Sequence, residues 1–195
     1  GFVTLLSSRI FSAYAMNVAF VSVMFFSFIA AAPEVMVSVL NRPPNEYGYY
    51  FVLIPSAFMA GNYVARWLST RFGVKRMITS GSWLSITGIS IALILHLSGL
   101  LHPLALFMPI ALTTFGNGIS LPNAQAAAIN EFPDMAGSAS GLTGFLQMGF
   151  SAVAAQLVAL MFNGTVYPML LLMLTAATLS LVSFYIAQRH TDSSA

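Results

Sequence analysis

The chain has 195 residues, of which 58% are hydrophobic and only 6% are charged. This balance excludes an ordinary soluble domain, and a formal net charge of +2 does not suggest a nucleic-acid partner. The absence of cysteine excludes disulfides, thiolate catalysis and cysteine metal sites, and the three histidines have no third ligand near them in sequence. The composition indicates that lipid surrounds most of this chain.

Six apolar stretches are long enough to cross a membrane as helices, which takes about 20 residues each. In chain order the predicted spans are residues 11–32, 47–68, 77–97, 103–130, 135–162 and 166–188. We therefore expect an all-α polytopic membrane protein with six transmembrane helices, forming a single domain over residues 1–195.

Local signals set the expected ends of these helices. The first span is expected to continue past Pro33 toward Leu40, until the consecutive prolines at 43–44 end it. Pro109 and Pro122 predict kinks within the fourth span. After the sixth span, residues 189–195 are expected to form a polar tail.

The distribution of lysine and arginine predicts the orientation in the membrane. If both termini lie on one side, only Arg42 falls on the opposite side. The basic residues on the terminal side are Arg9, Arg66, Arg71, Lys75, Arg76 and Arg189. The positive-inside rule then predicts that both termini are cytoplasmic.

Helical spacing gathers polar side chains on single faces of the first, second, fourth and fifth spans, which we expect to face protein or water. Asn17, Asn117 and Gln147 are the candidates for substrate contact. Such residues also join helices without touching a ligand, and that alternative stays open here. Glu34 is the fourth candidate for substrate contact, because it is the only carboxylate near membrane depth, and the alternative is a solvated interfacial side chain.

Four glycines lie within the predicted fifth span. Gly137 and Gly141 form a GxxxG pattern, and Gly144 and Gly149 extend the same small-residue surface. Two interpretations remain open, namely static helix packing and a gating helix that slides or bends.

Signals for catalysis are absent from the sequence. The segment from Gly137 to Gly141 superficially resembles a serine-nucleophile elbow, but its central residue is Ala139 and it opens a helix. The sequence contains neither a phosphate-binding glycine loop nor an HExxH pattern. We expect a protein that is not an enzyme and that uses no cofactor and no metal.

The segment from Gly61 to Arg76 resembles the signature loop of major facilitator superfamily transporters, in the form found in their second half. Arg71, Gly73, Lys75 and Arg76 match that pattern. The acidic position of the pattern is occupied by Thr70, which puts its charge relay in doubt.

Two further segments resemble Bcr/CflA-type drug:proton antiporters within that superfamily. Residues 28–36 resemble the end of their helix seven, and residues 132–147 resemble the start of their helix eleven. The resemblance implies that the chain corresponds to helices seven to twelve of a twelve-helix transporter. Glu34 is a departure, because its position is usually apolar in that group.

The resemblance also implies how such a chain works. It implies one bundle of two inverted three-helix repeats, facing a second six-helix bundle across a cavity that opens alternately to each side. The implied function is proton-driven efflux of small amphipathic compounds, by the C-terminal half of a multidrug transporter in the bacterial inner membrane. The second bundle would be the chain's own N-terminal half or a second copy, and lipid and protons would be further partners.

Two groups of residues are candidates for gating. The resemblance implies this role for the basic loop residues Arg71, Gly73, Lys75 and Arg76, and the small-residue pattern suggests it for the helix glycines Gly137, Gly141 and Gly144. Two alternatives stay open, namely a half-size protein that acts as a homodimer and a membrane scaffold fragment that transports nothing.

Overall fold

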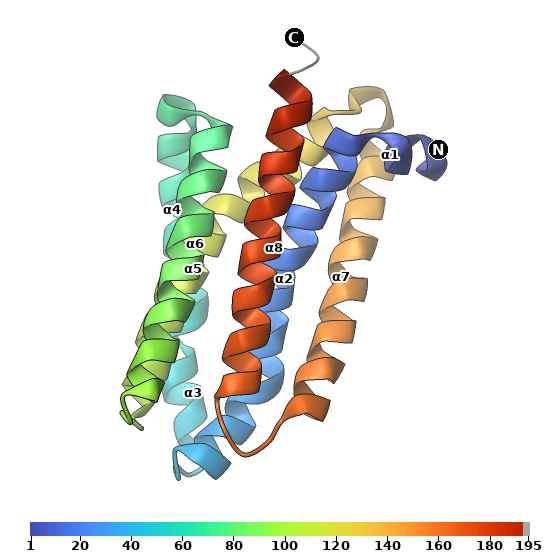
Figure 1. Cartoon of the computed structure of the whole chain (residues 1–195). Helices are drawn as coiled ribbons and strands as arrows, with labels where there is room; N and C mark the ends of the chain where they lie inside the picture. Colours follow the sequence, from blue (N-terminus) through green and yellow to red (C-terminus); the bar gives the residue numbers. More distant parts are fainter. Residues whose placement is uncertain (193–195) are drawn as a thin grey trace.

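The computed structural model describes residues 1–192, and this part of the chain is helical without any strand (Figure 1). Its α-helices are α1 Phe2–Ser7, α2 Arg9–Glu34, α3 Glu46–Phe51, α4 Leu53–Phe72, α5 Val74–Leu97, α6 Pro103–Asn130, α7 Ala136–Met161 and α8 Tyr167–Asp192. A π-helical turn, η1 Val35–Val39, follows α2, and a 3₁₀ turn, η2 Pro133–Met135, precedes α7. The expected all-α class of a polytopic membrane bundle is confirmed.

Within residues 1–192, five helical stretches are long and apolar enough to cross a membrane. They are Arg9–Val39, Val74–Leu97, Pro103–Asn130, Pro133–Met161 and Tyr167–Asp192. Helix α4 forms where the second span is predicted, but it is not among the five, since Asn62, Arg66 and Arg71 interrupt its apolar surface. Its crossing of the membrane stays a prediction.

Several helix ends differ from those predicted. Helix α2 runs through Pro33 into η1, as expected, whereas the second span is interrupted at Val52 between α3 and α4. The tail expected from Arg189 is wrong as far as Asp192, because α8 continues to that residue. Residues 193–195 of the predicted tail lie outside the described part.

Helix α6 packs chiefly against α4 and α5, while α2 packs chiefly against α7 and α8. Glycines allow α6 to touch the backbones of both of its neighbours. A Cβ atom at Gly116 would overlap the carbonyl oxygen of Gly81 on α5, and one at Gly118 would overlap the carbonyl oxygen of Phe58 on α4. These two close approaches need residues without side chains.

The glycines of α7 are in a different situation. A Cβ atom at Gly137, Gly141, Gly144 or Gly149 would meet no atom within 4 Å among the described residues. Static packing inside this bundle is therefore not their role. The same helix exposes Phe145 and Leu160, which are 72% and 73% exposed, so α7 presents an apolar surface to its surroundings.

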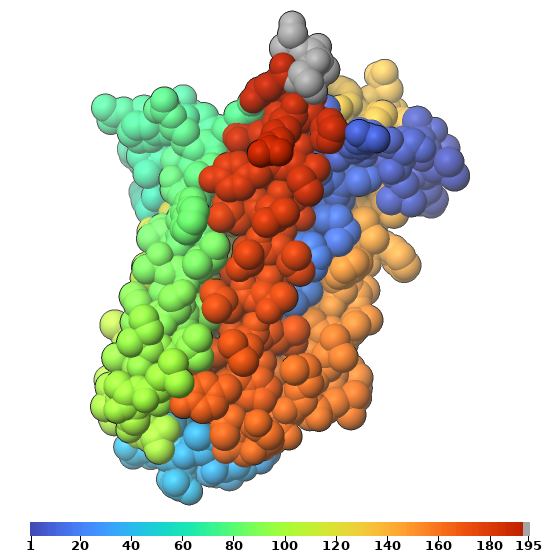
Figure 2. Space-filling model, in the orientation of Figure 1, coloured from blue at the N-terminus to red at the C-terminus, as the bar shows by residue number. Residues whose placement is uncertain are grey.

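Both described chain ends lie at the same end of the bundle as the turn between α4 and α5 (Figure 1). The basic residues of that turn and the end of α8 therefore lie at the same end of the bundle, and the side of the membrane that this end faces stays a prediction. Figure 2 shows α8 between α5 and α7 on one face of the molecule.

Candidate functional site

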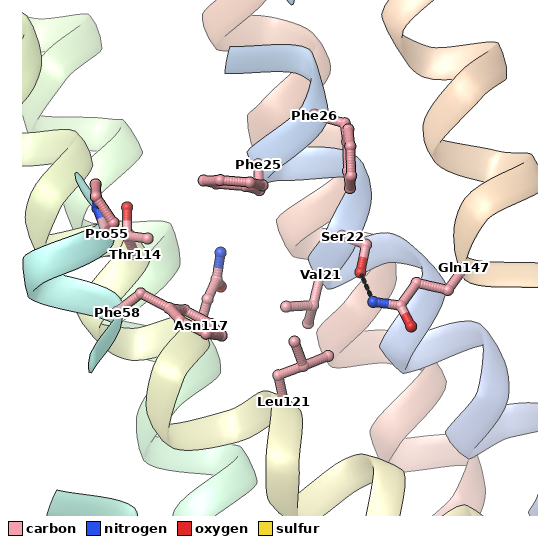
Figure 3. Close-up of a pocket in the computed structure, with 10 residues that line it drawn as sticks. All are labelled: Val21, Ser22, Phe25, Phe26, Pro55, Phe58, Thr114, Asn117, Leu121 and Gln147. Atoms are coloured by element: carbon pink, nitrogen blue, oxygen red, sulfur yellow. Dashed lines mark hydrogen bonds between the residues drawn. The ribbon is translucent and has the colours of Figure 1, made fainter. Parts of the chain in front are cut away.

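A hollow of about 250 Å³ lies at mid-length between α2, α4, α6 and α7 (Figure 3). It is lined by Val21, Ser22, Phe25, Phe26, Pro55, Phe58, Thr114, Asn117, Leu121 and Gln147. These residues come from the first, second, fourth and fifth predicted spans, so the expected lining helices are confirmed for this hollow.

The lining is aromatic and uncharged. Phe25, Phe26 and Phe58 surround the space, and none of its ten lining residues carries a formal charge. Complete small-molecule sites enclose roughly 300–1,000 Å³. At about 250 Å³ the hollow has the size of one part of such a site, with a few polar groups to orient what enters it.

Asn117 of α6 is the most enclosed polar residue of this lining, with 3% of its surface exposed. The hydroxyl of Ser85 on α5 donates to its Oδ1 at 2.7 Å. The Nδ2 atom points into the hollow (Figure 3) and has no hydrogen-bond partner among residues 1–192. One end of this amide is therefore held by the protein, and the other is directed at a ligand position.

Gln147 of α7 separates this hollow from a second, smaller one. Its Nε2 donates to Ser22 Oγ on α2 at 2.7 Å, and its Oε1 accepts from Gln125 Nε2 on α6 at 3.3 Å. The second hollow is lined by Gln125, Ile129, Ser140, Thr143, Gly144 and Gln147. Gln147 thus joins three helices at a polar position between two spaces.

The other two candidates for substrate contact lie elsewhere. Asn17 is fully buried, and its Nδ2 donates to the carbonyl oxygen of Ser180 at 2.7 Å and to the hydroxyl at 3.0 Å, which joins α2 to α8. Glu34 is exposed at the end of α2, where Ser38 donates to its carboxylate. The structure brings Asn117 and Gln147 together and leaves Asn17 and Glu34 outside the hollow; their substrate role stays a prediction.

The basic loop forms a tight turn between α4 and α5. Gly73 has φ +85°, a left-handed conformation that favours glycine. The guanidinium of Arg71 lies 5.5 Å from the centre of the Phe72 ring, and the Lys75 ammonium lies 3.1 Å from a carboxylate oxygen of Asp192. The Thr70 hydroxyl donates to the Trp67 carbonyl oxygen of its own helix. The gating role of this loop stays a prediction.

Sequence reasoning missed two parts of the site. Ser22, Phe25 and Phe26 have the i, i+3, i+4 spacing of one helix face, so this spacing was a usable signal. Ser85 was missed because it lies in the third span. That span contains nothing more polar than serine and threonine before its ends, so it was not among the spans expected to face protein or water.

Comparisons with known proteins show which proteins this chain is similar to. The chain is 27% identical over 168 residues to a protein described as a bicyclomycin resistance protein homolog of Haemophilus influenzae, which covers 82% of this chain and 40% of the relative. It is 31% identical over 140 residues to the multidrug transporter MdfA of Escherichia coli O6:H1, covering 71% and 34%. The same transporter of Edwardsiella piscicida is 28% identical over 145 residues, covering 73% and 35%. No family model matches the chain.

The fold and the hollow together define a polytopic helical membrane protein with an uncharged cavity between its helices. Its relatives are transporters, and the resemblance found in the motifs is confirmed: the chain is a relative of the Bcr/CflA-type multidrug transporters of the major facilitator superfamily. It spans about a third to two fifths of the length of these relatives.

Proposed function

We propose that this chain is the C-terminal six-helix bundle of a secondary-active multidrug efflux transporter. The observation that supports the proposal best is the hollow itself, because it lies at mid-length and takes its lining from four helices. A site near the bilayer midplane between helices is what alternating access requires. Its aromatic lining suits amphipathic compounds, and Asn117 and Gln147 supply the polar contacts.

The packing of the helices supports the idea of two three-helix repeats. Helix α6 lies against α4 and α5, and α2 lies against α7 and α8. Two repeats, α2–α4–α5 and α6–α7–α8, give this pattern when the first helix of each packs against the second and third helices of the other. Inverted repeats of this kind are common in transporters.

The proposed location is the bacterial inner membrane, with both termini in the cytoplasm. A cysteine at Thr70, in a chain without native cysteines, would mark the side of the basic loop. A membrane-impermeant maleimide should react with it in inside-out vesicles and not in right-side-out vesicles. A cysteine at His102 should behave in the opposite way, and the same result at both positions would contradict the topology.

Transport by this bundle needs a second bundle, either the first half of the transporter or another copy of the chain. The test is proton-driven uptake of one uncharged and one cationic aromatic dye into inside-out vesicles that contain the chain alone or the chain with a first-half partner. Uptake only with the partner supports the half-transporter, and uptake by the chain alone supports the homodimer. Absence of proton-dependent uptake in both preparations contradicts transport by this chain.

A further inference from the structure

The Gly-Asn-Gly triplet at residues 116–118 places three consecutive residues of α6 in three different surroundings. Consecutive residues of an α-helix point about 100° apart. Gly116 meets the backbone of α5 and Gly118 meets the backbone of α4, so the two flanks of α6 are both occupied. Asn117 lies between these directions, and its side chain enters the hollow (Figure 3).

The close approach of α5 also determines which way the amide is turned. Because Gly81 and Gly116 let the two backbones touch, the short side chain of Ser85 reaches Asn117 Oδ1 at 2.7 Å. The single hydroxyl hydrogen of Ser85 has two further acceptors, the carbonyl oxygens of Gly81 at 2.9 Å and of Thr113 at 3.1 Å, and Asn117 Oδ1 is the nearest of the three. With the oxygen engaged by this donor, the amide nitrogen is the atom presented to the hollow. Ser85 is thus a positioning residue for Asn117.

The electrostatic character of the hollow limits what can pair with that nitrogen. No carboxylate lines the space, so a cation that enters loses its hydration without gaining a counter-ion from this bundle. An apolar molecule without polar atoms leaves the amide N–H unpaired, which costs free energy in a dry site. An uncharged molecule with a hydrogen-bond acceptor avoids both costs, because it needs no counter-ion and its acceptor pairs with the amide N–H.

We propose that the hollow selects uncharged aromatic compounds that carry a hydrogen-bond acceptor such as a carbonyl oxygen, which Asn117 Nδ2 binds in the orientation set by Ser85. This inference rests on the proposed function, because it names the substrate class of the same cavity. It also implies that recognition of charged compounds depends on residues outside this bundle.

Binding of matched probes to the purified chain in lipid nanodiscs tests the proposal, with empty nanodiscs as the partition blank. The probes are 2-acetylnaphthalene, which has an acceptor, 2-ethylnaphthalene, which has none, and N,N,N-trimethyl-2-naphthylammonium, which is a cation. The acetyl compound should bind about threefold to tenfold more tightly than the ethyl compound, as expected for one net hydrogen bond. The cation should bind more weakly than the acetyl compound.

Two variants with matched controls locate the effect. Asn117→Leu should abolish the preference for the acetyl compound while retaining affinity for the ethyl compound. Asn123→Leu is its control, because Asn123 is a buried asparagine of the same helix that bonds to the Ile119 carbonyl and does not line the hollow.

Ser85→Ala should reduce the preference without changing affinity for the ethyl compound, since only the orientation of the amide is released. Its control is Ser82→Ala, which removes a buried hydroxyl of α5 that has no partner within residues 1–192. This split between the two probes is a readout that a purely structural role of Ser85 would not produce.

Several results would overturn the proposal. They are equal binding of the acetyl and ethyl compounds, a preference that survives in Asn117→Leu, tightest binding of the cation, and no specific binding of any probe. Failure of the transport proposal is recognised separately. In that case the acceptor preference persists in nanodiscs, while proton-driven uptake is absent from vesicles that contain both halves.

Discussion

The ammonium nitrogen of Lys75, at the start of α5, lies 3.1 Å from a carboxylate oxygen of Asp192, at the end of α8. The acidic residue of the loop pattern is absent, since that position is Thr70, and the Thr70 hydroxyl bonds to its own helix. Lys75 nevertheless has an acidic partner, which is supplied by a distant part of the chain. The pair connects the basic loop to the last described residue of the last helix.

Removing this ion pair should lower the free energy of unfolding by a small amount that depends on salt. Both side chains are exposed, and exposed ion pairs contribute roughly 0–1 kcal/mol. Asp192→Asn should therefore lower the free energy of unfolding in detergent by less than about 1 kcal/mol, and the difference should vanish in 1 M salt. Arg189→Gln, on the same end of α8, serves as the control. A loss of several kcal/mol that persists in salt would contradict the surface character of the pair.

The two classes of glycine should respond in opposite ways to the same substitution. Gly116→Ala places a methyl group onto the Gly81 carbonyl oxygen, and overpacking of this kind costs typically 1–3 kcal/mol. Gly141→Ala adds its methyl group in open space and should be neutral or stabilising by up to about 1 kcal/mol. Thermal unfolding of both variants in the same detergent measures the difference. Equal destabilisation would show that the two helix faces are packed alike.

Gln147 should limit passage between the two hollows. Gln147→Ala removes the bonds to Ser22 and Gln125 and opens the space between them. Thr143→Cys places a buried reporter in the second hollow, and it should then react faster with a small water-soluble thiol reagent than it does in the presence of Gln147. Gln156→Ala, which alters an exposed glutamine of the same helix, should leave the rate unchanged. An unchanged rate in Gln147→Ala as well would mean that this side chain is no barrier.

The exposed surface of α7 should become shielded when the second bundle is present. A cysteine at Phe145 should react with a lipid-soluble maleimide in the chain alone and become protected when a first-half partner is co-expressed. A cysteine at Ile94, which is exposed on α5, should stay reactive in both preparations. Protection at Ile94, or its absence at Phe145, would place the partner on a different face.

The sequence predicted most of the helices because strong local signals mark their ends. The fourth predicted span, 103–130, coincides with α6, which begins at Pro103 and ends just before Glu131. Proline is well suited to the first position of a helix, where its missing N–H group is not needed. The break at Val52 has a signal that was not used in predicting the second span, because Pro55 cannot donate a hydrogen bond to the carbonyl of Phe51 and its ring clashes with that carbonyl.

The candidate site was predictable only in part. Helical spacing correctly placed Asn117 and Gln147 on lining helices, because polar side chains that share a face tend to face the same space. It could not separate them from Asn17, whose contact is determined by the neighbouring helix α8. Long-range packing of this kind also brought Ser85 to Asn117, and no pattern within the third span reveals that contact.

The glycine contacts of α6 have a mechanical consequence. Sliding between helices requires side chains to repack, and a shift of α5 by about one turn would press Met77 or Ser85, which share a helix face with Gly81, into a space that accepts only hydrogen. Helices α4, α5 and α6 should therefore behave as one stiff wall, against which α2 and α7 can be displaced. A molecule held by Asn117 would then stay on the stationary side of the cavity while the opposite side moves past it.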